Sequence, residues 1–439
     1  MKKRNGCANS NRAKSDLAVA DPLSRTTTTT YDPAGRTINS IKPKGSITTA
    51  AYDPAGRPID AVNPLDYTAS TVYDNAGRIL QAVSAKGRAT AYAYDAANRQ
   101  TKTVNPAGEV TTTVYDAAGQ VIAQVDPLGR TTSFAYDLLG RRISVTDPLG
   151  HITTAVYDAL GHVLATIDAN GHATTNVYDV IGQRLVLIDP NNQRTTFSYD
   201  LLGHDLGSVD PLNRAVTFAY DFVGNRTLKL DPRGNRISYT YDLARRLTGE
   251  QHPDGSTFTY TYDLLGNRLT AASPAGTFTT TYDLLNRPIT VTQPDGQVLT
   301  YTYDVLSHRA TLTAPDGGSF TCTYDLKGRL NTVTNPQNHT TTLAYDLKDR
   351  LTTKQLANGV TVAQTYDAAG QLLNLSHVNS SNTLIECLTY TYDAASRRTG
   401  LSFLNGDAIT WDYDATGQLT SEQRTGSNSY NVTYSVSVR

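Results

Sequence analysis

The chain has 439 residues and a balanced charge, with 39 Lys and Arg against 40 Asp and Glu and a formal net charge of −1. This even balance argues against a nucleic-acid or membrane-surface binder, which would carry a basic patch. The sequence contains no apolar run of ~18 residues, so it predicts no membrane-spanning helix. The opening residues also lack the apolar stretch of a secretory signal. The three cysteines stand far apart, without the spacing of a disulfide framework or a zinc site. Residues 1–20 carry no repeat, and we expect a disordered N-terminus there.

Residues 21–437 form one tandem array, in which nineteen Tyr-Asp pairs recur. Successive tyrosines are twenty-one positions apart from Tyr31 to Tyr262, then twenty positions apart once, and twenty-one again as far as Tyr366. A longer step of twenty-six positions leads to Tyr392, after which the original period returns. A fixed period of this size predicts a repeat architecture instead of several separate globular cores.

Two turns recur in the repeat, and both follow the pattern Asp-x-x-Gly. The tyrosine turn directly follows the repeat tyrosine, as in Asp137–Gly140. The distal turn comes about ten residues later and often holds proline, as in Asp147–Gly150. Asp accepts hydrogen bonds from the turn, Pro fixes φ, and Gly supplies the left-handed residue that closes it. Asn also tolerates positive φ, and it replaces glycine at Asn98, Asn192, Asn213 and Asn286.

The segments between the turns are about six residues long, the usual length of a β-strand. One kind is rich in Thr and aromatic residues and ends on the tyrosine, as in Thr131–Tyr136, while the other is aliphatic, as in Val121–Val125. An aromatic residue often precedes the tyrosine by two positions and so shares its face: Phe134, Phe197, Phe218, Tyr260, Tyr301 and Trp411. These patterns predict an all-β fold of tandem 21-residue β-hairpins that form a continuous antiparallel spiral sheet.

The odd repeat length requires one irregular residue in each repeat. If both turns have the same loop length, only an even number of residues keeps successive tyrosines on one face. Aliphatic residues three positions apart, such as Ile122 and Val125, indicate a β-bulge between them. A longer loop in each repeat is the alternative.

Two places break the period. Near Pro274–Gly276 one residue is missing, and we expect the turn to absorb the loss because loops tolerate changes of length. The 26-residue step contains the polar stretch Asn374–Asn382, which predicts an enlarged hairpin loop near residues 374–385.

No motif in the sequence predicts catalysis. The signatures of serine hydrolases, zinc proteases and nucleotide-binding loops are absent. Equivalent turn aspartates of adjacent repeats are expected ~10 Å apart, too far to share a proton, so each should hold its own turn. The same spacing argues against a zinc site at the histidines that follow turns, which are His151, His162, His172 and His204. We therefore predict no catalytic, cofactor or metal site.

Arginine follows several tyrosine turns, and we expect it to pair with the turn aspartate, although anion binding is an alternative. These residues are Arg36, Arg57, Arg78, Arg329 and Arg350. The rows of tyrosine are expected to pack as cross-strand ladders. Stacking on sugars is the other reading, for which the sequence identifies no particular carbohydrate-binding residue.

The pattern Tyr-Asp-x-x-Gly-Arg followed by Asp-Pro-x-Gly resembles the YD or RHS repeat family, with close matches at Tyr31–Arg36, Tyr73–Arg78 and Tyr324–Arg329. The resemblance covers about residues 21–437 and implies a hollow shell made of a β-strand spiral. Family members include bacterial polymorphic toxins, insecticidal toxin-complex subunits, wall-associated proteins and teneurin ectodomains. In bacterial members the shell typically encloses a toxic C-terminal domain that a protease site releases. After Tyr413 we find neither the terminal core segment nor a toxin domain, so those activities are not carried over.

The sequence thus predicts a non-catalytic shell or scaffold segment that encloses or displays a partner, such as a toxin domain or other cargo outside this chain. The resemblance implies a secreted or cell-surface protein, and no cofactor, nucleic acid or membrane insertion is expected. The alternative is a cell-surface adhesion module that binds carbohydrate through its tyrosine rows. Both a complete product and a fragment of a longer protein fit the sequence.

Overall fold

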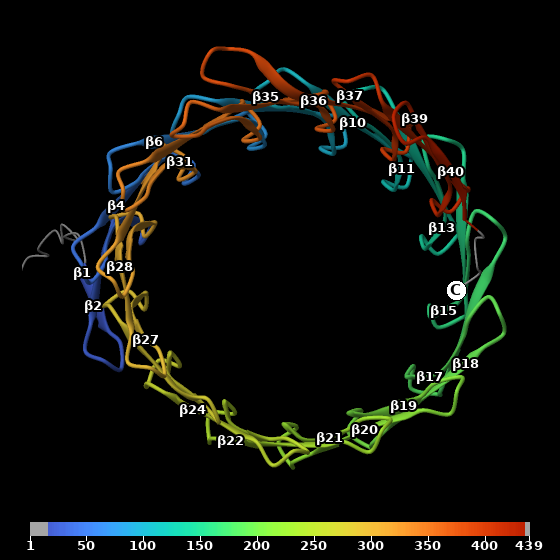
Figure 1. Cartoon of the computed structure of the whole chain (residues 1–439), viewed down its shortest axis with the longest axis horizontal. Helices are drawn as coiled ribbons and strands as arrows, with labels where there is room; N and C mark the ends of the chain where they lie inside the picture. Colours follow the sequence, from blue (N-terminus) through green and yellow to red (C-terminus); the bar gives the residue numbers. More distant parts are fainter. Residues whose placement is uncertain (1–15, 435–439) are drawn as a thin grey trace, which may run out of the picture. The chain divides into compact units, whose positions relative to one another are not determined.

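The computed structural model describes residues 16–434. Within this range the chain forms forty β-strands in one unclosed antiparallel sheet and no helix, so the all-β prediction is confirmed. Figure 1 shows the strands following one another along the chain. Since residues 16–434 hold no helix, none is long and apolar enough to cross a membrane.

Nineteen strands end on a repeat tyrosine: β2 (Thr26–Tyr31), β4 (Ile47–Tyr52), β6 (Thr68–Tyr73), β8 (Ala89–Tyr94), β10 (Val110–Tyr115), β12 (Thr131–Tyr136), β14 (Ile152–Tyr157), β16 (Ala173–Tyr178), β18 (Arg194–Tyr199), β20 (Ala215–Tyr220), β22 (Arg236–Tyr241), β24 (Thr257–Tyr262), β26 (Gly276–Tyr282), β28 (Val298–Tyr303), β30 (Ser319–Tyr324), β32 (Thr340–Tyr345), β34 (Thr361–Tyr366), β36 (Leu384–Tyr392) and β38 (Ala408–Tyr413).

The remaining strands follow the tyrosine turns or stand at the two ends: β1 (Asp16–Ala20), β3 (Thr37–Ile41), β5 (Pro58–Val62), β7 (Ile79–Val83), β9 (Gln100–Val104), β11 (Val121–Val125), β13 (Arg142–Thr146), β15 (Val163–Ile167), β17 (Arg184–Ile188), β19 (Asp205–Val209), β21 (Arg226–Leu230), β23 (Leu247–Gln251), β25 (Arg268–Ser273), β27 (Pro288–Thr292), β29 (Arg309–Thr313), β31 (Leu330–Thr334), β33 (Leu351–Gln355), β35 (Leu372–Val378), β37 (Arg398–Phe403), β39 (Leu419–Thr425) and β40 (Tyr430–Thr433).

The sheet begins earlier than the repeat pattern predicts. β1 pairs with β2 along its whole length, from Asp16 opposite Thr30 to Ala20 opposite Thr26. The prediction of a disordered segment through residue 20 is therefore wrong for Asp16–Ala20, because an edge strand gains backbone hydrogen bonds without needing the side chains of the repeat. Residues 1–15, where the rest of that prediction falls, lie outside the described residues.

The two turns of the repeat have the same geometry. In a tyrosine turn, the Gly35 N–H donates to the Asp32 carbonyl at 2.9 Å. In a distal turn, the Gly129 N–H donates to the Asp126 carbonyl, also at 2.9 Å. Both glycines have positive φ, and so do the four asparagines that the sequence predicts as their replacements. Because the two turns have equal length, the extra residue of the 21-residue repeat must lie in a strand.

That residue forms a β-bulge, as the parity argument predicts. Val114 lies opposite Ala123 and Tyr115 opposite Val121, so Ile122 is left without a partner in the ladder. The same shift directly precedes the tyrosine in the other described pairs of this kind. The position needs correction: the extra residue is Ile122 itself, and the ladder from Ala123 to Val125 is regular.

The missing residue of the 20-residue step is absorbed by a turn, as predicted. A two-residue turn at Pro274 and Ala275 joins β25 to β26. The predicted enlarged loop near residues 374–385 is wrong. The turn Asn379–Asn382 has the ordinary length, and the added residues instead extend β35 and β36. Leu375 pairs with Leu388 there and His377 with Glu386, so the ladder continues through both apolar and polar residues.

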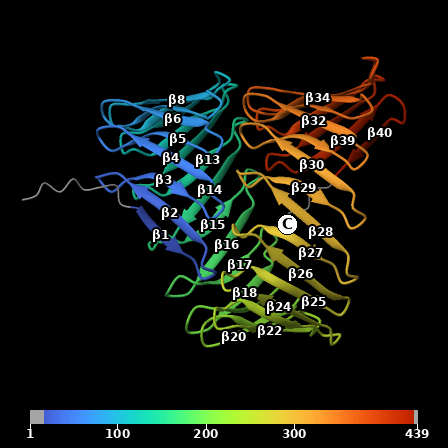
Figure 2. The ribbon, with the colours of Figure 1, turned by 90° about the vertical axis from the view of Figure 1, so that its left-hand side faces the viewer.

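The sheet is a ribbon one layer thick. Among residues 16–434 no hydrophobic side chain is fully buried, and the two buried polar residues are Arg25 and Asp407. The chain divides into two compact units. One unit holds the residues up to Ala91 with Thr261–Ala271 and Ala275–Asn338, and the other holds Tyr92–Tyr260, Ala272–Pro274 and the residues from His339 onward. Figure 2 shows neighbouring strands such as β3 to β6 side by side, with turns at both strand ends.

Candidate functional site

In many repeats that carry arginine after the tyrosine turn, three side chains clamp the turn to the next repeat. Asp53 accepts the Arg57 N–H through Oδ1 at 2.9 Å and the Arg57 Nε–H through Oδ2 at 2.6 Å. The Arg57 guanidinium lies 4.6 Å from the ring centroid of Tyr73 and donates through Nη1 to the Asp74 carbonyl. The Tyr73 hydroxyl donates to the Pro58 carbonyl at 2.9 Å. Aspartate, arginine and tyrosine therefore join successive repeats.

This arrangement confirms two sequence predictions. The turn aspartates hold their own turns, and arginines after tyrosine turns pair with those aspartates. The five predicted arginines all make this ion pair: Arg36, Arg57, Arg78, Arg329 and Arg350.

The histidines occupy the arginine position of their turns. Nδ1 of each lies 2.8–3.2 Å from Oδ2 of its own turn aspartate: His151, His162, His172 and His204. The structure does not bring the four together. His162 and His204 also stack on the tyrosine of the next repeat, with ring centroids 4.9 Å apart. His308 plays the same part, and its position after a tyrosine turn was the signal that could have identified it.

The two faces of the ribbon carry different side chains. Arginine guanidiniums cover the aromatic residues that precede the tyrosine, as Arg184 does over Phe197 at 4.6 Å. On the opposite face, threonines of adjacent strands form hydrogen-bonded pairs, for example Thr302 with Thr311 at 2.7 Å. The tyrosine rows thus pack within the ribbon through arginine, and not mainly through contacts between aromatic rings.

Within each unit, distal turns meet tyrosine turns that come much later in the chain, and we call this line of contact the seam. In the first unit Lys44 Nζ lies 2.7 Å from Asp283 Oδ2, and Lys86 Nζ lies 2.9 Å from Asp325 Oδ2. In the second unit the contacts are Glu109 with Lys348, Arg130 with Gln371, and Asn170 with Asp414. The separation grows from 239 residues to 244 beyond the 26-residue step, so the added five residues leave the pairing of turns unchanged.

In the first unit's seam, the Asp283 carboxylate is held by two cations. Its Oδ2 lies 2.6 Å from Arg287 Nη2 as well as 2.7 Å from Lys44 Nζ. Its carbonyl accepts from Arg25 Nη1 at 3.1 Å, and Arg25 Nη2 continues to Asn286 Oδ1 at 2.9 Å. Arg25 is buried, so a distal turn inserts a guanidinium into the opposing tyrosine turn.

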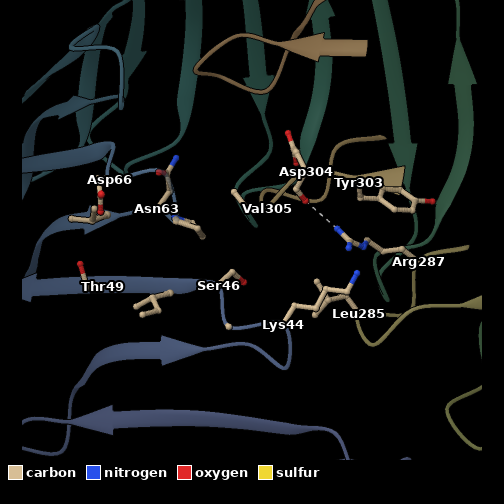
Figure 3. A pocket seen from close by; sticks show the side chains of 14 residues that line it. Lys44, Ser46, Thr49, Asn63, Asp66, Leu285, Arg287, Tyr303, Asp304 and Val305 are labelled. Carbon is tan, nitrogen blue, oxygen red and sulfur yellow. Dashed lines mark hydrogen bonds between the residues drawn. The ribbon is translucent and has the colours of Figure 1, made fainter. Parts of the chain in front are cut away.

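Beside these contacts lies a pocket of about 530 Å³ in the first unit (Figure 3). Leu285, Val305 and Tyr303 line it from the tyrosine-turn side, and Asn63 and Asp66 from the distal-turn side. Its cations are already used: Arg287 holds Asp283, the Asp304 carbonyl and the Tyr303 ring, and Lys44 holds Asp283. The pocket is therefore a gap along the seam, and neither Lys44 nor Arg287 is free to hold a ligand there.

The seam carboxylates should make the protein sensitive to acid. Burial raises the pKa of Asp283, but hydrogen bonds from Arg287 and Lys44 outweigh it and hold the pKa well below its usual range. Burial likewise raises the pKa of Asp325, but hydrogen bonds from Arg329 and Lys86 outweigh it and hold the pKa well below its usual range. Unfolding returns these groups to a pKa of about 4, so the unfolded chain binds more protons, and stability falls as the pH drops below that value. Thermal unfolding between about pH 5 and pH 2.5 measures this loss.

The matched control is the double variant Asp283→Asn and Asp325→Asn. It should unfold at a lower temperature than the wild type at pH 7, and its midpoint should fall less on acidification. An identical pH profile for the two proteins would show that the seam carboxylates are not responsible.

A second buried residue, the carboxylate Asp407, was not anticipated from the sequence. It accepts from the Ser427 N–H at 2.8 Å and from Arg424 Nη2 at 3.0 Å, and it fixes the turn between β39 and β40. Its position at the end of a distal turn, where other repeats carry Arg or Gln, was a weak signal. Within residues 16–434 no group of three or more His, Cys, Asp or Glu side chains is placed to hold a metal ion.

A one-layer antiparallel ribbon whose turns are clamped by Asp, Arg and Tyr defines a Tyr-Asp repeat protein. The RHS Repeat family matches residues 73–110, 115–152 and 223–257, and the Teneurin YD-shell family matches residues 295–437. The chain belongs to the RHS/YD-repeat family, as its turns predict. No curated protein matches it by sequence.

Solved structures share the fold. A crystal structure titled TcdB2-TccC3-Cdc42 aligns with a TM-score of 0.68 and 18% identity over 93% of this chain and 27% of that one. A second TcdB2-TccC3 structure, titled with TEV, aligns with a TM-score of 0.57 and 18% identity over 95% and 27%. The Tc holotoxin pore of Photorhabdus luminescens gives a TM-score of 0.53 and 17% identity over 95% and 26%. This chain therefore spans about a quarter of the length of these proteins.

Proposed function

We propose that this chain is a non-catalytic wall segment of a shell, which encloses or displays a polypeptide outside this chain, such as a toxin domain. The observation that carries the proposal is the seam. A ribbon one layer thick cannot form a barrier unless its edges meet, and in each unit the distal turns dock on tyrosine turns through ion pairs and hydrogen bonds.

The rest of the geometry serves the same role. Aspartate and arginine side chains of many turns are paired with each other, which stiffens the wall. The match to the Teneurin YD-shell family and the likeness to the Tc toxin structures support a shell that accompanies toxin components. By the same likeness, we propose that the protein is secreted or displayed at the cell surface.

Carbohydrate binding receives less support. An arginine guanidinium covers one face of the repeat tyrosine in many repeats, and the hydroxyl donates to a backbone carbonyl. A sugar that stacked on that face would have to displace an arginine held by an aspartate. No described contact favours this alternative over packing.

Protection of a joined polypeptide tests the proposal. An unfolded, protease-sensitive segment fused after Arg439 should be cut more slowly than the same segment free in solution, because a wall restricts access of the protease. A variant with Lys44→Met, Lys86→Met and Asn170→Ala, which weakens the seam, should lose part of the protection. Equal cleavage of the free segment and both fusions would contradict a wall.

A further inference from the structure

Six consecutive tyrosine turns of the second unit expose large apolar side chains. Each turn has two residues between its Asp and its Gly or equivalent, and in these repeats they include Leu138, Leu139, Leu160, Val180, Ile181, Leu201, Leu202, Phe222 and Leu243. Leu138, Leu201 and Leu243 are fully exposed. We call this row the apolar edge.

The exposure is not required by the turn. Earlier tyrosine turns place small residues at the same two positions, such as Pro33 and Ala34 or Pro54 and Ala55, and adopt the same hydrogen bonds. Large apolar residues in a solvent-facing turn gain nothing in the isolated chain, and a contiguous exposed row of them marks an interaction surface.

The seam shows what such turns contact. Leu284 and Leu285 occupy a tyrosine turn that a distal turn covers, and Leu284 is 48% exposed. Leu347 of the second unit, beside the Glu109–Lys348 contact, is 43% exposed. Turns of the same composition therefore lose about half of their exposure when a distal turn packs against them.

A complementary surface is also exposed in the second unit. The distal turn Asp210–Asn213 has the same Asp-Pro-Leu pattern as Asp147–Gly150. Leu149 in the seam region is 39% exposed, whereas Leu212 is 70% exposed. The apolar edge and this distal turn are thus both exposed.

We propose that a second copy of this chain docks head to tail on the first, with its distal turn Asp210–Asn213 packed on the apolar edge. The contact extends the seam from one chain to the next. Because it joins two different surfaces, it is heterologous and can propagate into a stack instead of closing as a two-fold dimer.

Sedimentation velocity of the full chain at ~1–100 μM tests the proposal, since contacts of modest size dissociate in this range. The wild type should sediment faster as its concentration rises. The edge variant Leu138→Pro, Leu139→Ala, Leu201→Pro and Leu202→Ala should weaken association by on the order of tenfold or more. The new residues are those of the chain's own Asp-Pro-Ala-Gly turns, and the amides of Leu138 and Leu201 make no described backbone bond, so the fold should persist.

A complementation experiment tests whether two different surfaces, the apolar edge and the distal turn Asp210–Asn213, meet in the contact. Leu212→Arg gives this turn the same third residue as the natural turn Asp231–Gly234 and should also block association. Mixing this variant with the edge variant should restore a dimer, because each retains one intact surface. As a control, Leu284→Pro with Leu285→Ala should lower thermal stability and leave association unchanged.

The proposal is overturned if the wild type stays monomeric over this range, or if the edge variant associates like the wild type. Association of Leu212→Arg alone would also overturn it, in favour of edge-to-edge pairing. A monomeric wild type that floats with phosphatidylcholine vesicles would identify the apolar edge as a lipid-binding surface instead.

Discussion

Replacing Asp283 with alanine should lower the free energy of unfolding by about 2–3 kcal/mol, because it leaves Lys44 and Arg287 without their carboxylate partner at a largely buried position. The Asp283 side chain is 7% exposed, and its Oδ2 receives both Lys44 and Arg287. Loss of one partner of a fully buried pair costs about 3–5 kcal/mol, and the partly exposed Lys44 reduces that figure. Urea unfolding at pH 7 measures the change.

Asp53→Ala is the matched control. Asp53 holds the same kind of turn in the same unit and pairs with Arg57, and no described contact joins it to a distal turn. The loss should be smaller. A double-mutant cycle with Lys44→Met should give a coupling of about 0.5–3 kcal/mol for Lys44 and Asp283. Equal losses at Asp53 and Asp283, with no coupling, would show that the seam adds nothing to stability.

Gly207→Ala should destabilise the second unit by at least about 3 kcal/mol, because it forces a backbone clash in a strained conformation. Gly207 has a φ of +136°, and an added Cβ would lie 1.9 Å from the Val216 carbonyl oxygen. The obstacle belongs to the paired strand β20, so a side-chain rotation cannot relieve it. The clash should separate β19 from β20, which hydrogen exchange of the Ala215–Tyr220 amides would detect together with a lower unfolding midpoint.

Gly234→Ala serves as the control in the same unit. Gly234 also has positive φ, at +82°, but an added Cβ meets no atom within 4 Å. Its cost should be limited to the left-handed conformation, about 1 kcal/mol. Gly234→Asn should be milder still, because Asn192 and Asn213 occupy equivalent positions with φ of +60°. If alanine were tolerated equally at both sites, the assigned conformation of Gly207 would be wrong.

The local structure of the repeat could be predicted from the sequence because it is set by neighbours in the chain. An aspartate four residues before an arginine is close enough to close the turn and pair with it, as Asp53 and Arg57 do. The odd period forces a bulge whenever both turns have equal length, which is why counting residues was enough to anticipate one near Ile122.

Two predictions of non-strand structure were wrong because backbone pairing with a neighbouring strand outweighed the local amino-acid composition. Asn379–Asn382 lies in a polar stretch that suggests a long loop, yet the ladder of β35 and β36 continues into it. Asp16–Ala20 lacks the repeat pattern and still forms an edge strand. In both cases backbone hydrogen bonds to a strand already in place outweighed the preference of the side chains.

The sequence by itself therefore determined the all-β repeat, its two turns, the presence of a bulge and the pairing of turn Asp with Arg, since each depends on residues within one or two periods. Only the tertiary structure decided that Lys44 meets Asp283 and that Glu109 meets Lys348. Lys44 and Asp283 stand 239 residues apart, and the register of such partners depends on the accumulated twist and bending of many strands. No local sequence pattern specifies this accumulated twist and bending, so the seam and the apolar edge could be identified only from the tertiary structure.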